Sequence, residues 1–204
     1  MTAIRMGLDR LRRTSGPASV IDDVARETER LSHRIDNLLS MARLDAGTFR
    51  SRPEPTPAAD LFRATLESLS LVLAGHDVDV SVEPETPELF VDPTLAVEIL
   101  SNLLENAARA TPLGAGLALA AGPSPVDRAR VRLEVLDRGS GVPLAIKREA
   151  SADPGDAGRT GLGLTICRSL AHALDGSVSL LDRTGGGTIA RLDLPAAPAT
   201  TESA

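Results

Sequence analysis

The chain has little of what proteins use for covalent cross-links, membrane anchoring or binding to nucleic acid. Its only cysteine, Cys167, excludes an intramolecular disulfide and a multi-cysteine zinc site. No stretch approaches the run of about 20 apolar residues that a transmembrane helix needs. The formal net charge of −6 argues against broad attraction to nucleic acid or anionic lipid. The sequence therefore predicts a soluble, cytoplasmic protein without a membrane segment or a nucleic-acid partner.

Residues 1–50 have the pattern of a helical hairpin. A short amphipathic helix around residues 4–11 is broken by the segment TSGP, and a longer helix is expected from about residue 18 to 46. Apolar residues repeat in sevens along the longer helix, which is typical of a coiled-coil or bundle seam. Two helices bury little surface alone, so we expect a homodimer in which each chain supplies half of a four-helix bundle. A hairpin folded back on its own chain remains the alternative. The seam residues are Ile21, Val24, Leu31, Ile35, Leu38 and Ala42.

A proline-rich segment separates this part from the rest. RPEPTP has a proline at every second position, so residues 51–57 cannot form a helix and are expected to be a semi-rigid linker. Residues 58–195 are expected to form a second domain, and residues 196–204 a disordered tail.

The second domain alternates helical and strand patterns. This order predicts an α/β sandwich with a mostly antiparallel sheet and helices on one face. Asp92 is expected to cap a strong helix whose first turn contains Pro93, whereas residues 117–120 are a poor strand candidate. The predicted helices are residues 61–73, 92–110 and 160–174, and the predicted strands are residues 78–82, 131–136, 178–181 and 188–194.

Two asparagines share one face of the helix expected over residues 92–110. Asn102 and Asn106 are four residues apart. Their carboxamide oxygens suit a hard cation such as Mg²⁺, and Arg109, about one turn further on, could reach the same phosphates. Alone, the spacing is weak, because two surface asparagines at this distance are more common than a site.

An acidic residue at a predicted strand end precedes two glycines. In VLDRGSGVP, Asp137 ends the strand, and Gly139 and Gly141 follow it at alternate positions. Glycine permits backbone conformations closed to other residues and lets a ligand approach, while the carboxylate could accept a hydrogen bond from an exocyclic amine. A plain Asp-x-Gly turn explains the same residues about equally well.

A glycine-rich loop leads into the last predicted helix. Gly158, Gly161 and Gly163 lie at its start, where backbone N–H groups favour phosphate. The loop is not a Walker A motif, because no Lys-Ser/Thr pair follows its last glycine, nor a Rossmann turn, because no buried strand runs directly into it. A second glycine run, TGGGT, precedes the closing strand.

The order of these motifs is more specific than any one of them. It resembles the N, G1 and G2 boxes of the ATP-binding domain of bacterial sensor histidine kinases, which has a Bergerat-type nucleotide fold. NLLSMARLDAG, residues 37–47, resembles the end of the second helix of that family's dimerisation and phosphoacceptor domain. The sequence is most similar to the osmosensitive, potassium-responsive branch of this family.

The resemblance implies ATP and Mg²⁺ as ligands, protein-histidine phosphotransfer as the activity and a response regulator as partner. Asn106, with Asn102 as a further ligand, would hold the metal–phosphate assembly, and Asp137 would bind the adenine amine. The other contacts that the resemblance implies are with phosphate for Arg109, Gly161, Leu162 and Gly163, and with the adenine pocket for Gly139, Gly141 and Thr188.

The chain also departs from the family pattern. The phosphoacceptor histidine would fall a few residues before Met1, and residues 143–161 contain no aromatic residue where the family has a phenylalanine box. Two interpretations therefore stay open. The chain is the ATP-binding core of a histidine kinase that acts on a histidine missing from this chain, or it is a kinase-inactive ATP-binding and dimerisation module that regulates a partner.

The remaining histidines and the cysteine have structural interpretations. His33 lies off the heptad seam and is expected to face solvent, although a surrogate phosphoacceptor is the alternative. His76 is expected in a surface turn, and His172 in packing or at the surface. Cys167 is expected to be a small core residue and not a reactive thiol.

Overall fold

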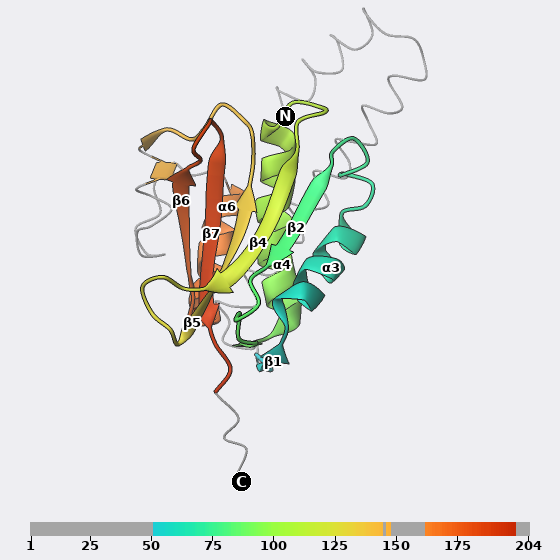
Figure 1. Ribbon diagram of the computed structural model, residues 1–204. Coiled ribbons are helices and arrows are strands. Elements are labelled where there is room, and N and C mark those ends of the chain that lie inside the picture. Colours follow the sequence, from blue (N-terminus) through green and yellow to red (C-terminus); the bar gives the residue numbers. More distant parts are fainter. Residues whose placement is uncertain (1–50, 145, 148–161, 199–204) are drawn as a thin grey trace, which may run out of the picture. The chain divides into compact units, whose positions relative to one another are not determined.

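A five-stranded sheet with three helices on one of its faces makes up most of the described protein (Figure 1). The computed structural model describes residues 51–144, 146–147 and 162–198. These all belong to the second of two units, residues 1–43 and 44–204, into which the chain divides. The predicted N-terminal hairpin, the heptad seam, Gly158 and Gly161 lie outside the described residues. The helices are α3 (Ala58–Ser68), α4 (Pro93–Ala110) and α6 (Leu162–Ala173).

The sheet is antiparallel except at one edge. Its strand order is β2-β4-β5-β7-β6, and only the β2–β4 pair is parallel. This confirms the α/β sandwich with a mostly antiparallel sheet. In order across the sheet, the strands are β2 (Val78–Val82), β4 (Leu117–Pro123), β5 (Arg130–Leu136), β7 (Thr188–Pro195) and β6 (Ser177–Asp182).

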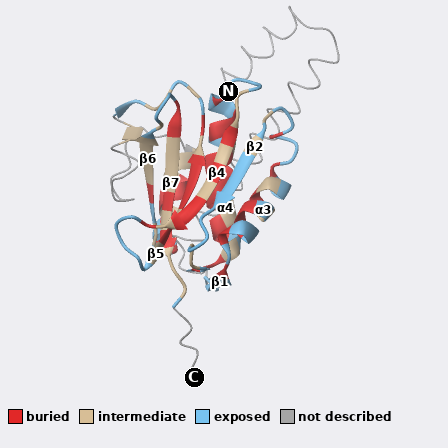
Figure 2. Cartoon of the chain, viewed as in Figure 1, coloured by how far each residue is buried: buried red, intermediate tan, exposed pale blue. Residues whose placement is uncertain are grey.

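The core lies between the sheet and its helices. Along β5, Val131, Leu133 and Val135 are buried and alternate with polar residues that face away from the helices. Leucines and isoleucines on α4 and α6 complete this apolar layer (Figure 2). The fully buried side chains of the two helices include Ile99, Leu100, Leu104, Ile166 and Leu170.

Helix α4 begins as the sequence predicts. Pro93 is its first residue, and the Asp92 side chain accepts hydrogen bonds from the backbone N–H groups of Thr94 and Leu95. The other carboxylate oxygen of Asp92 accepts the backbone N–H of Arg52 at 3.0 Å. One side chain therefore both caps the helix and fixes the chain entering the domain.

Three strands were not predicted or had only a weak sequence signal. Leu117–Pro123, four of whose residues are small, is the second strand of the sheet and pairs on both sides. Glu54–Thr56, β1, lies within the proline segment and pairs with β3 (Leu89–Val91), also not predicted, in a small two-stranded sheet. Alanine and proline have low strand propensity, so for β4 and β1 pairing with distant segments decided the outcome. The role of residues 51–57 as an inter-domain linker stays a prediction.

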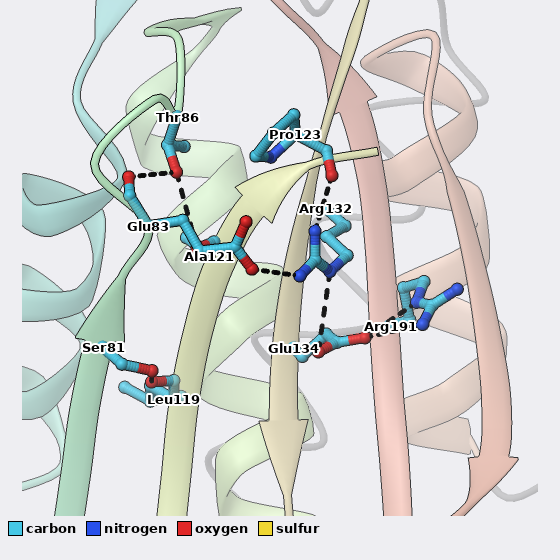
Figure 3. A network of polar contacts seen from close by, with 9 residues as sticks. All are labelled: Ser81, Glu83, Thr86, Leu119, Ala121, Pro123, Arg132, Glu134 and Arg191. Carbon is cyan, nitrogen blue, oxygen red and sulfur yellow. Dashed lines mark hydrogen bonds and ion pairs between the residues drawn. The ribbon is translucent and has the colours of Figure 1, made fainter. Parts of the chain in front are cut away.

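The sheet face opposite the helices carries a row of alternating charges (Figure 3). Arg132 on β5 pairs with Glu83, which follows β2, and Arg191 on β7 donates to Glu134 at 2.9 Å. Arg132 also lies 3.8 Å from Glu134, which links the two pairs. The row crosses β4 at Gly122, where a Cβ would lie 2.6 Å from the Arg132 guanidinium. Glycine thus leaves the space through which the arginine reaches Glu83.

Candidate functional site

The carboxylate of Asp137 is fixed at the end of β5 by two backbone donors. Its Oδ1 accepts the N–H of Gly139 at 2.8 Å and the N–H of Thr188 at 2.9 Å. The side chain is buried, and among the described residues no donor meets its Oδ2. The carboxylate is therefore oriented by one oxygen, while the other is available to an amine such as that of adenine.

The loop after β5 lies directly against the end of α4. A Cβ on Gly139 would lie 2.8 Å from the carbonyl oxygen of Ala110, so only glycine fits there without displacement. Beside it, the backbone N–H of Arg138 donates to the Thr111 hydroxyl at 3.2 Å. The structure therefore joins two predicted motifs, the asparagine helix and the Asp-x-Gly-x-Gly loop.

The asparagine pair lies against the start of α6. A Cβ on Gly163 would lie 3.6 Å from Asn106 Nδ2 and 3.9 Å from Asn102 Oδ1. Asn102 is buried and its amide donates to the Glu98 carbonyl, whereas Asn106 is exposed. Carboxamide oxygens beside a helix start form a donor set compatible with Mg²⁺ and phosphate.

Arg109 forms an ion pair along its own helix. Its guanidinium pairs with Glu105 at 2.9 Å, one turn back on the same helix. Arg109 and Glu105 are four residues apart on α4, a spacing that favours this ion pair. The structure therefore shows Arg109 engaged along its own helix and leaves its contact with phosphate as a prediction.

The glycine hairpin between β6 and β7 contributes more than the sequence indicated. Gly187 has a φ of +102°, and a Cβ there would lie 2.2 Å from the Asp137 carbonyl oxygen. That close approach brings the buried Thr188 into register with Asp137, since each donates its N–H to an oxygen of the other. Arg183, which the sequence analysis missed, donates to the Asp137 carbonyl at 2.8 Å. The run of three glycines was the signal that pointed to this hairpin.

The remaining predicted site residues are only partly described. Gly141 has a φ of +80°, in agreement with the need for glycine in this loop. Leu162 is the first residue of α6, but its side chain is outside the described residues, as is Gly161. The structure therefore brings Asn102, Asn106, Gly163, Asp137, Gly139 and Thr188 along the C-terminal half of α4.

Cys167 is a core residue, as predicted. It is fully buried on α6, and its thiol approaches the Ile99 carbonyl at 3.8 Å. Burial, reinforced by the charge of Glu98, raises the pKa of the Cys167 thiol to about 12. His172 is exposed, and His76 lies partly exposed in the turn before β2. These three residues lie in packing or surface positions.

The chain matches a known domain family over residues 91–198. The family is described as "Histidine kinase-, DNA gyrase B-, and HSP90-like ATPase", and the match covers more than half of the chain, including every described site residue. The chain belongs to this family. The ATPase domain of the family binds ATP, and the motifs are those of its sensor histidine kinase branch.

Known sensor proteins resemble the chain well beyond the matched domain. It is 26% identical over 184 residues to Sensor protein KdpD of Clostridium acetobutylicum, and the alignment covers 86% of this chain and 20% of that protein. It is 31% identical over 207 residues to Sensor protein CreC of Escherichia coli, covering 95% and 42% respectively. The solved structure of full-length ShkA in complex with AMPPNP aligns with a TM-score of 0.69 and 26% identity, over 91% of this chain and 40% of that one.

The chain thus spans less than half the length of these relatives. Within the described residues, no helix is long and apolar enough to cross a membrane.

Proposed function

We propose that this chain is the ATP-binding catalytic core of a two-component sensor histidine kinase. It uses Mg²⁺–ATP to phosphorylate a histidine that is missing from this chain, and a response regulator receives the phosphoryl group. The observation that carries the proposal is the Asp137 carboxylate, oriented by Gly139 and Thr188 and joined through Ala110 to the helix of Asn102 and Asn106.

Different residues bind the two ends of the nucleotide. Asp137 Oδ2 accepts the adenine amine, because the other oxygen is already occupied by two N–H groups. Asn106 and Asn102 hold the metal and phosphates, with the backbone at Gly163 beside them. Bound Mg²⁺ would neutralise charge on the phosphates, while the chain positions them, and positioning supplies much of the catalysis in phosphoryl transfer.

A titration with a fluorescent ATP analogue tests the nucleotide site. Asp137→Asn places an amide beside the adenine amine, and Asn106→Ala removes a metal ligand, so we expect each to weaken binding at least tenfold, or about 1.4 kcal/mol. Asp127→Asn is the matched control, because Asp127 precedes the opposite end of β5 and an asparagine keeps its acceptor for the Ala129 N–H. Equal affinity in all four proteins would refute the proposal.

Phosphotransfer distinguishes the kinase from the inactive module. The absence of an aromatic box between residues 143 and 161 favours the inactive module. After incubation with γ-labelled ATP, we expect no acid-labile label on this chain itself, because no histidine here has the phosphoacceptor pattern. A kinase core would label a histidine-bearing helical hairpin of a sensor kinase added in trans, whereas the inactive module would bind ATP without labelling it. Acid-labile label that disappears in His33→Gln would instead make His33 the acceptor.

A further inference from the structure

Strand β2 is an edge strand whose outer side has no partner among the described residues. It is the first strand in the order β2-β4-β5-β7-β6 and pairs only with β4. In Figure 2 it is exposed along most of its length, unlike β4 beside it. Val80 and Val82 retain 47% and 39% of their surface, although they lie on the same sheet face as the buried Leu119 and Ala121.

The register shows which backbone groups face outward. The Asp77 carbonyl accepts the Leu117 N–H and the Glu83 N–H donates to Ala121, so the odd-numbered residues face β4. The N–H and C=O groups of Val78, Val80 and Val82 therefore face the open edge. Unpaired groups of this kind are a template for an added strand.

The same edge is strongly acidic. No lysine or arginine occurs between Arg63 and Arg109, and five exposed carboxylates lie on β2 or beside it. Glu83 is already paired with Arg132 (Figure 3), which leaves the charge of the others uncompensated by a described arginine or lysine. The five are Asp77, Asp79, Glu83, Glu85 and Glu88.

This charge disfavours a second copy of the chain as the added strand. If β2 of a second copy paired antiparallel with this β2, three registers would pair the outward-facing N–H and C=O groups of at least two valines. They place Asp79 opposite Asp79, Asp77 opposite Glu83, or Asp79 opposite Glu83. Like charges directly opposite each other destabilise a strand pair. The penalty is largest where Asp79 meets Asp79 and smaller where Glu83, paired with Arg132, is one partner, whereas a basic segment meets no such penalty in any register.

A groove continues from the end of β2. It has a volume of about 570 Å³ and lies between the β2–β3 and β4–β5 loops. Glu85 and Asp127 contribute carboxylates to it, Arg128 contributes a guanidinium group, and Pro87 and Pro123 contribute apolar wall. The groove can receive the apolar stem of a long side chain from a segment that runs along β2, and the acidic row on β2 itself supplies the preference for positive charge.

We propose that β2 binds an extended basic segment of a second protein, which adds to the sheet as a sixth strand. Apolar residues of that segment lie over Val80 and Val82, and its alternate lysines or arginines lie beside Asp77 and Asp79. Backbone hydrogen bonds supply the pairing, and charge selects the partner. The surface is separate from the nucleotide site, so the proposal goes beyond the proposed function and does not depend on it.

A peptide that alternates basic residues with valine, Lys-Val-Arg-Val-Lys-Val-Arg labelled with fluorescein, tests this with the full chain. We expect saturable binding by fluorescence anisotropy at physiological ionic strength. Val80→Pro should weaken it at least tenfold, because it removes an outward N–H without removing a bond to β4. Asp79→Asn should weaken it severalfold, whereas Asp175→Asn, an exposed carboxylate after α6, should leave it unchanged.

Two further measurements do not depend on how well the proline variant folds. The same peptide N-methylated at its valines should lose binding to the wild-type chain, because in an antiparallel pair the valines opposite Val80 and Val82 supply the donors that face β2. Amide exchange should show new protection at Val80 and Val82 on binding, while the N–H groups of Asp79 and Ser81, already bonded to β4, should change little. No binding, equal binding by every variant and peptide, or concentration-dependent amide protection of Val80 and Val82 in the chain without peptide would each overturn the proposal.

Discussion

The Arg183 guanidinium donates a hydrogen bond of 2.8 Å to the backbone carbonyl of Asp137, 46 residues earlier in the chain. Arg183 begins the glycine hairpin, and Asp137 carries the carboxylate proposed to bind adenine. The bond therefore fixes the hairpin against the residue that recognises the base. Its loss should affect nucleotide binding as well as stability.

For Arg183→Met we expect the free energy of unfolding to fall by about 1 kcal/mol, because the carbonyl loses a charged donor. ATP affinity should fall roughly fivefold as the hairpin loosens around Asp137. Urea unfolding and analogue titration measure the two effects. Arg183→Lys keeps the charge without the guanidinium geometry and should be intermediate; wild-type affinity in both variants would contradict the positioning role.

Gly139→Ala should displace the loop after β5. The new Cβ would lie 2.8 Å from the Ala110 carbonyl oxygen, which belongs to the backbone and cannot turn away. We expect a loss of stability of about 1–3 kcal/mol and at least tenfold weaker ATP binding. Gly116→Ala is the matched control, because its nearest neighbour would be 3.9 Å away. Thermal unfolding and analogue titration of both variants give the answer.

Gly163→Ala distinguishes an effect on stability from an effect on nucleotide binding. Its Cβ would meet Asn106 and Asn102 at 3.6 and 3.9 Å, which are ordinary contact distances. Alanine also suits a helix better than glycine by up to about 1 kcal/mol. Stability should therefore be unchanged or higher, while ATP affinity falls because the methyl group fills space beside the asparagine pair. An unchanged affinity would argue that the phosphates lie elsewhere.

Cys167 should resist alkylation in the native protein. Its pKa is raised from 9.0 to about 12, so the thiol stays protonated in the folded state while an unfolded chain ionises near 9. The stabilisation that this difference contributes is present below pH 9 and is lost as the pH rises towards 12. We expect iodoacetamide to modify Cys167 only in denaturant at pH 8. Rapid modification of folded protein, detected by mass spectrometry, would contradict its burial.

The predicted homodimer can be tested in the full chain through the heptad seam. Leu31→Glu combined with Leu38→Glu places two charges on that seam, and we expect sedimentation velocity to show a dimer becoming a monomer. Arg34→Glu, off the seam, should leave the dimer intact. A monomeric wild-type protein would rule out the bundle interpretation.

Local sequence determined the elements whose signals lie within a few residues of each other. Asp92 and Pro93 fixed the start of α4 because a capping side chain and a proline at the first turn act on adjacent backbone groups. The burial of Cys167 followed from an apolar helix face. The order of the asparagine helix and glycine loops was enough to indicate the ATPase family.

Only the tertiary structure decided the features that depend on residues far apart in the chain. The Asp137 carboxylate is oriented by Thr188, 51 residues away, and the alanine-rich β4 exists because β2 and β5 pair with it on either side. The open edge of β2 is likewise a property of strand order, since the alternation in its sequence predicted a half-buried strand and could not say that one side would lack a neighbour. Pairing energy comes from groups that meet only in the folded chain, so no local pattern contains it.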